Sequence, residues 1–164
     1  MQDVQSRPDS RGIDIQKVGV KNVHLPLQIA TKAGGWQSVL GNASLSVELP
    51  MQFKGTHMSR FIEVLLSWGQ KPISNVSITS ILKETCEALS ATKAHISIRF
   101  KYFVPKCAPV SGRESVLDYN CEFSGAVDGA RHTFVMGVEV PVTSCCPCSK
   151  EISSFGAHNQ RTMI

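Results

Sequence analysis

Residues 18–30, VGVKNVHLPLQIA, decide the fold class because apolar side chains recur at every second position. The alternation slips once after Val20, which is typical of a β-bulge, and Pro26 indicates an edge position or a strand end. Residues 32–35, KAGG, are a turn sequence, and the alternation returns over residues 36–49. The sequence therefore predicts a long antiparallel hairpin at the start of the domain.

The spacing of apolar residues becomes helical after the hairpin. A first helix with a stop at Gly69 is predicted from apolar residues three and four positions apart, namely Met58, Phe61, Ile62 and Leu65. A second helix follows Pro72, with Ser74 or Asn75 as its N-cap. Cys86 lies beside the apolar stripe of this second helix and is expected in the core.

Alternation of period two returns in the second half of the chain. Residues 96–102 and 116–124 are predicted strands, separated by a break over residues 105–112. Asp128-Gly129 is a turn pair, and a last strand runs over residues 132–140 and ends at Pro141. Strands and helices do not alternate, so we predict an α+β fold, an antiparallel sheet with two helices on one face.

Length and composition describe one ordinary globular domain. The 164 residues are 42% apolar and only 18% charged, and their net charge is +4. The composition excludes a disordered tail, a coiled coil and a basic nucleic-acid-coating protein. The mild positive charge suits an anionic small ligand. Residues 1–16 are predicted to be an extended polar lead-in, and residues 17–164 the domain. Without a membrane span or a signal sequence we expect a cytoplasmic protein, in which the six cysteines stay reduced.

The chemistry is concentrated in residues 143–161, TSCCPCSKEISSFGAHNQR. Three cysteines fall within four positions directly after a predicted strand, where reactive groups are often displayed. Pro147 favours extended backbone before it, so Cys146 and Cys148 are expected to face one pocket while Cys145 faces away. His158 follows a glycine that lets the chain turn back.

Thiolate and imidazole are preferred ligands of zinc and related ions, and a catalytic site needs about three protein ligands and an open position. Cys146 and His158 supply two ligands, and Glu151 is a candidate third whose direction nothing fixes. A buried structural cluster or a single reactive thiol fits the same spacing. At the first helix start, His57 and Arg60 could hold an anion, but helix capping explains that segment equally well.

Three segments together resemble GTP cyclohydrolase of type IB, a bacterial folate-pathway family: VELP at 47–50, FKGTHMSRFIE at 53–63 and PVTSCCPCSKEISSFGAHNQR at 141–161. The resemblance implies a tunnelling-fold unit of order ββααββ. Such units assemble into barrels, so a homo-oligomer with active sites at interfaces is implied. The family is a hydrolase of cyclic amidine C–N bonds. It converts GTP to 7,8-dihydroneopterin triphosphate and formate, the first step of tetrahydrofolate biosynthesis.

Carried over to this sequence, the resemblance makes Cys146 a catalytic metal ligand and His158 a second ligand. Cys148 matches a second catalytic cysteine close to the substrate. Zinc, manganese or iron(II) would suit such mixed ligands. Lys150, Arg161 and Arg60 are the candidates for the triphosphate, and the sequence does not choose among them.

Family chains continue beyond this motif, whereas the sequence ends at Ile164, so the resemblance is to an N-terminal part. The expected carboxylate ligand and the glutamate that grips the purine would lie in the second half, and the 164 residues alone are expected to be poorly active. Two rival hypotheses stay open. One is a nitrile reductase of the same fold with Cys146 or Cys148 as nucleophile and a nicotinamide cofactor; the other is a non-catalytic metal-binding assembly domain.

Overall fold

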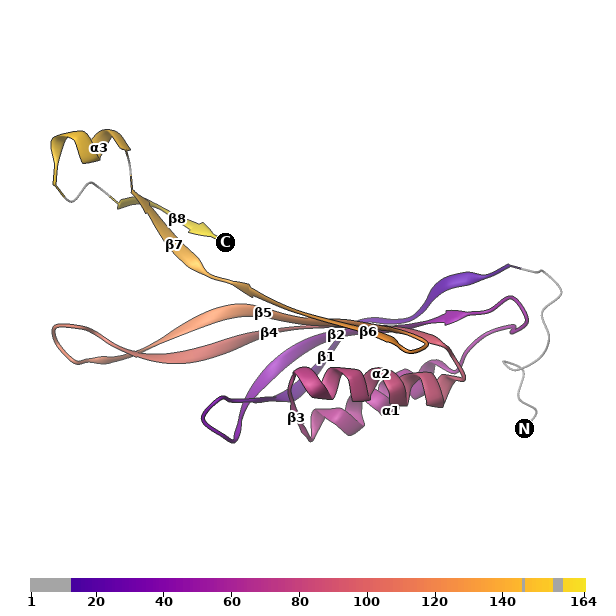
Figure 1. Cartoon of the computed structure of the whole chain (residues 1–164). Helices are drawn as coiled ribbons and strands as arrows, with labels where there is room; N and C mark the ends of the chain where they lie inside the picture. The colour runs from indigo at the N-terminus through magenta and orange to yellow at the C-terminus, as the bar shows by residue number, and fades with distance from the viewer. Residues whose placement is uncertain (1–12, 146, 155–157) are drawn as a thin grey trace. The chain divides into compact units, whose positions relative to one another are not determined.

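The computed structural model describes residues 13–145, 147–154 and 158–164 (Figure 1). Its described residues form two compact units, one of residues up to 102 with 121–137, the other of residues 103–120 with 138–164. A six-stranded sheet has the order β3-β1-β2-β4-β5-β6, and β7 pairs with β8 separately. The elements in chain order are β1 (Ile15–Ala30), β2 (Trp36–Leu49), α1 (Met58–Gly69), β3 (Pro72–Ile73), α2 (Asn75–Leu89), β4 (Lys93–Cys107), β5 (Glu114–Asp128), β6 (Arg131–Glu139), β7 (Pro141–Cys145), α3 (Pro147–Ile152) and β8 (His158–Met163).

The predicted hairpin is confirmed as β1 and β2. The two strands pair antiparallel from Ile15 opposite Leu49 to Ala30 opposite Trp36. The register shifts twice, and the second shift, after Val20, is the bulge that the sequence predicts. The turn that joins the strands has two successive glycines, Gly34 and Gly35, with φ of 91° and 81°, a conformation that other residues rarely adopt.

Both helices are confirmed, with the predicted end of α1 at Gly69 and the predicted start of α2 after Ser74. Ser74 is the N-cap of α2 and forms a capping box in which the Ser77 hydroxyl accepts the Ser74 backbone N–H at 3.1 Å. Between the helices lies β3, which pairs parallel to β1 with Ile73 opposite Ile29. The sheet is therefore mixed rather than antiparallel, and the order ββααββ is not confirmed. Two residues are too few to produce the alternation by which a strand is detected.

Two strands of the second half, β4 and β5, are longer than predicted. β4 runs through Pro105 to Cys107, and β5 begins at Glu114, so the break expected over residues 105–112 is present but lies over residues 108–113. The β2–β4 pairing ends with Gly41 opposite Phe100. Pro105 lies beyond that pair, so its missing N–H removes no hydrogen bond from the β2–β4 ladder.

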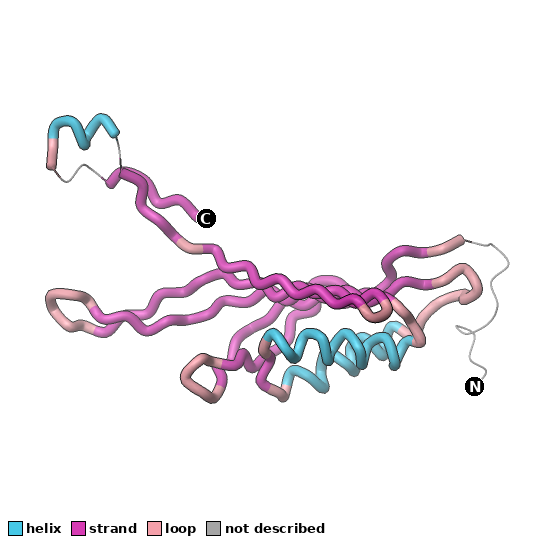
Figure 2. The backbone as a smooth tube through the Cα atoms, viewed as in Figure 1, coloured by secondary structure: helices cyan, strands magenta, loops and turns pink. Residues whose placement is uncertain are grey.

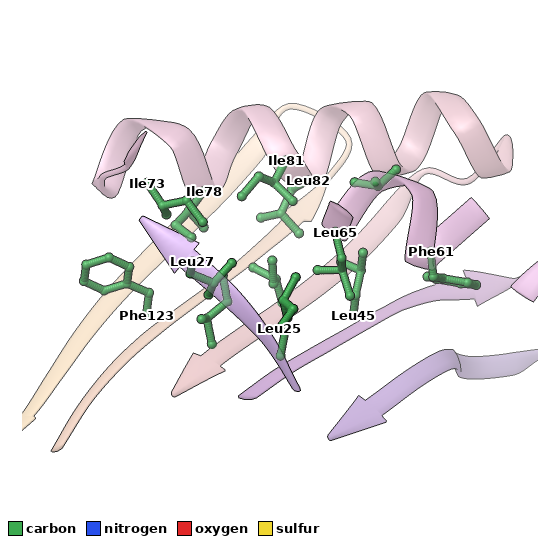
Figure 3. Packing of buried hydrophobic residues seen from close by; sticks show 14 of the residues in the cluster. Leu25, Leu27, Leu45, Phe61, Leu65, Ile73, Ile78, Ile81, Leu82 and Phe123 are labelled. Atoms are coloured by element: carbon green, nitrogen blue, oxygen red, sulfur yellow. The ribbon is translucent and has the colours of Figure 1, made fainter. Parts of the chain in front are cut away.

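Helices α1 and α2 lie side by side on one face of the sheet and bury its apolar side chains (Figures 1 and 2). Figure 3 shows these side chains between the helices and the strands. The Trp68 indole N–H donates to the Glu84 carboxylate at 2.7 Å and joins the two helices. The cluster consists of Leu25, Leu27, Ile29, Val39, Ala43, Leu45, Val47, Phe61, Val64, Leu65, Ile73, Ile78, Ile81, Leu82, Ala94, Ile96, Ile98, Phe100, Phe123 and Val127.

Replacing Phe61 with alanine is expected to lower the free energy of unfolding by about 3–5 kcal/mol, because the ring is fully buried and its removal leaves a cavity. Leu66→Ala is the matched control on the same helix, since Leu66 is 57% exposed and its loss should cost about 0.5 kcal/mol or less. Urea denaturation of the two variants measures both values. Equal losses would contradict the assignment of Phe61 to the centre of the core.

Candidate functional site

The cysteine-rich motif lies on a small hairpin of the second unit. β7 and β8 pair antiparallel from Pro141 opposite Met163 to Cys145 opposite His158. Beyond the last pair, Val140 and Ile164 exchange backbone hydrogen bonds of 2.7 and 3.1 Å. The chain therefore returns from the motif along the strand that enters it, and the backbone of His158 lies beside the end of β7.

The hairpin is irregular at the motif. Ser144 lies opposite Gln160, but the next residue, Cys145, lies opposite His158, so Asn159 is an extra residue in β8. Such bulges end regular pairing and redirect side chains, and they are frequent next to active sites. Cys146 lies outside the described residues. One peptide bond, about 3.8 Å between Cα atoms, separates it in the chain from Cys145.

Cys148 is found in a different local structure from the one expected. Pro147 begins α3, so Cys148 is helical, and the prediction that extended backbone carries its side chain is wrong. A proline is well tolerated at the first helical position, where its missing N–H would have no partner. The Cys148 thiol is exposed, as are Lys150 and Glu151 on the same short helix.

The donors of this hairpin fit a divalent metal ion by their chemistry. The register places the backbone of His158 opposite that of Cys145, the residue that precedes Cys146 in the chain. Sulfur and nitrogen donors suit zinc and other first-row divalent ions. Among the residues that the structure describes, no group of three or more histidine, cysteine or acidic side chains is placed to hold an ion.

The second candidate is an anion site at the start of α1. The structure gives one of its residues, Arg60, a structural role instead. His57 is the N-cap residue of α1. The Arg60 guanidinium donates to the backbone carbonyl of Ala88 at 2.7 Å and so connects α1 to the end of α2. This bond satisfies one of the carbonyls that a helix leaves without an internal partner near its C-terminus.

The remaining histidines lie on strands. His24 hydrogen-bonds the Asn42 side chain at 3.3 Å, and His132 is exposed at the start of β6. His95 on β4 is half-buried, and this burial, with Lys17 nearby, lowers its pKa below the ordinary 6.5. The fold therefore favours the neutral form of His95.

A family model and several related proteins match this chain over essentially its whole length. The model of the family described as "Type I GTP cyclohydrolase folE2" matches residues 1–164. Three similar proteins are each named GTP cyclohydrolase FolE2. That of Magnetococcus marinus is 51% identical over 100% of this chain and 62% of its own length. The protein of Azoarcus sp. is 48% identical over 99% of this chain and 60% of its own length. The protein of Syntrophus aciditrophicus is 49% identical over 100% of this chain and 64% of its own length.

The structure thus defines an α+β chain whose cysteine- and histidine-containing motif lies at a bulged hairpin. The chain belongs to the type I GTP cyclohydrolase FolE2 family. It spans about three fifths of the length of the curated relatives that it matches. The family resemblance is confirmed at this level. The finer subtype IB is not named by these matches, and correspondence to an N-terminal part is not borne out by them.

No helix among the described residues has the length and apolarity to cross a bilayer.

The lowered pKa of His95 predicts a loss of stability on acidification. Well above pH 6.5 the imidazole is neutral in both folded and unfolded chains, so it contributes no pH dependence there. As the pH falls through 6.5, the unfolded chain takes up the proton first, and the free energy of unfolding decreases until the lower folded-state pKa is reached.

Urea midpoints at about pH 7.5 and about pH 5.5 measure this loss, in a range above the ordinary titration of carboxylates. His95→Gln should lose less stability on acidification than the unchanged chain. His132→Gln, which alters an exposed histidine of β6, should behave like the unchanged chain. Identical losses for the two variants would contradict the role of His95.

Proposed function

We propose that the chain takes part in a metal-dependent GTP cyclohydrolase that converts GTP to 7,8-dihydroneopterin triphosphate and formate in folate biosynthesis. The observation that carries the proposal is the β7–β8 register, which brings the backbone of His158 to the end of the strand that leads into the cysteine motif. It is supported by the family match over residues 1–164 and by relatives named GTP cyclohydrolase FolE2.

In this proposal Cys146 and His158 hold a zinc, manganese or iron(II) ion, and Cys148 lies close to the substrate. When bound, the ion would supply Lewis acidity, which makes water a competent nucleophile near neutral pH. Cys146 and His158 would supply a thiolate and an imidazole as its protein ligands. The exposed thiol of Cys148 is accessible to a substrate that approaches α3.

The triphosphate needs cationic partners. Lys150 is exposed on α3, two residues after Cys148, and Arg161 belongs to β8 within the same hairpin. Lysine and arginine bind phosphate oxygens through charge-assisted hydrogen bonds. These two residues are therefore preferred here to Arg60, whose guanidinium already donates to the Ala88 carbonyl.

The tunnelling fold and a homo-oligomer with interfacial active sites are part of the same proposal. Two helices cover one face of the sheet, as that fold requires, and β6 is an edge strand. Val135 and Met136, neighbours on β6 that point to opposite faces, are each 62% exposed. An open edge that is apolar on both faces is a template for pairing with another chain, and a second copy of the chain is the proposed occupant. A cytoplasmic location is proposed with it.

Metal content and turnover test the proposal together. A purified full-length protein that contains this chain should bind one manganese or zinc ion per active site and form a fluorescent pterin from GTP after oxidation of the product. Cys146→Ser and His158→Ala should each reduce metal content at least about 10-fold, because each removes a ligand. Cys107→Ser is the matched control, since Cys107 is an exposed cysteine at the end of β4.

Two results would overturn the proposal. One is a chain that turns over GTP at the full rate with Cys146 replaced by serine. The other is equal metal content in the Cys107→Ser and Cys146→Ser variants. A stoichiometric ion whose removal abolishes turnover would also exclude a metal-free reductase that uses a cysteine nucleophile.

A further inference from the structure

The face of the sheet opposite the helices carries a hollow of about 610 Å³ within the first unit. Its floor follows the alternation of the strands: Ser44 and Ser46 point away from the core that Leu45 enters, and His95 and Ser97 do the same on β4. The residues around it come from five strands: Lys17, Gly19, Val20, Lys21, Ser44, Leu45, Ser46, His95, Ile96, Ser97, Ser124, Gly125, Ala126, Thr133 and Val135. We name this hollow the open-face groove.

Small side chains make the groove deep enough for a ligand. Gly19 lies opposite Ser46, and Ser46 lies opposite His95, so one row across three strands holds a glycine, a hydroxyl and an imidazole. A side chain at Gly19 would collide with the Leu45 carbonyl oxygen, so only glycine fits at this position. The volume falls in the range of about 300–1,000 Å³ that is usual for small-molecule sites.

The charge of the groove is positive. Lys17 and Lys21 line it from β1 and are exposed, and among the described residues neither forms an ion pair with a carboxylate. Two other cations on this face, Lys93 and Arg99, are paired. Lys93 lies 3.4 Å from the Glu48 carboxylate, and Arg99 lies 3.6 Å from that of Glu122.

The polar groups between the lysines suit an oxyanion. The hydroxyls of Ser46, Ser124 and Thr133 are donors that rotate to meet an acceptor. His95, kept neutral by its surroundings, has one N–H to donate. Lysine donates to phosphate as a point charge and needs no fixed geometry, which fits a position on the rim.

We propose that the open-face groove is a binding site for a small phosphate-class anion, held by Lys17 and Lys21 with hydrogen bonds from Ser46 and His95. The site belongs to the first unit and shares no residue with the hairpin proposed to hold a metal ion. Its failure would therefore leave the proposed cyclohydrolase function untouched, and the reverse also holds.

The test uses the whole chain and inorganic pyrophosphate at low ionic strength. The imidazole C–H resonances of His95 are followed by NMR during the titration, with exposed His132 as an internal reference. A saturable shift of the His95 resonance at millimolar pyrophosphate, with His132 unchanged, is expected. Lys17→Gln/Lys21→Gln should weaken the affinity at least about 10-fold, because two charge-assisted hydrogen bonds are removed.

Lys32→Gln/Lys83→Gln is the matched control, since it removes the same net charge from exposed positions in the β1–β2 turn and on α2. It should change the affinity less than about 2-fold, given that distant surface charges are screened. Circular dichroism and the urea midpoint confirm that both double variants are folded. No saturable shift of His95, or an equal weakening by both double variants, would overturn the proposal.

Discussion

The register between β2 and β4 is the constraint on which both faces of the first unit depend. Leu45 lies opposite Ile96 and Ser46 opposite His95, so apolar pairs fall on one face and polar pairs on the other. A slip of one residue would exchange the two faces and put serine and histidine under the helices. Burial of the apolar face by α1 and α2 fixes this register, and the same register places the polar groups of the open-face groove.

Much of this arrangement is predictable because it is periodic. The β1–β2 hairpin, its bulge after Val20, both long helices and the Ser74 cap follow from local sequence, since each depends on spacing or on a capping residue. β3 is not predictable in this way, because two residues carry no period. The continuation of β4 through Pro105 depends on the absence of a β2 neighbour there, which is a tertiary fact.

The candidate sites, like the fold, are predictable from the sequence only in part. Three cysteines and a histidine within one motif are visible in the sequence, but the short helix that begins at Pro147 is not. Extended chain and the first position of a helix both suit a proline, and the structure has the helix. The open-face groove gives no linear motif, because its residues come from five strands. One signal in the sequence could have pointed to it. Serine and histidine alternate with apolar residues in several predicted strands, and aligning these strands side by side would have gathered the polar residues on one face.

The two candidate sites also differ in how the fold supports them. The groove lies on the same strands that bury the core, so its floor is as fixed as the packing beneath it. Of the metal-ligand candidates, His158 lies on a two-stranded hairpin whose pairing shifts between Ser144 and Cys145. Pairs of strands without a third strand or a covering helix are marginally stable in water. An ion held between Cys146 and His158 would add a cross-link at that weak end, so metal binding and the order of the hairpin are expected to be coupled.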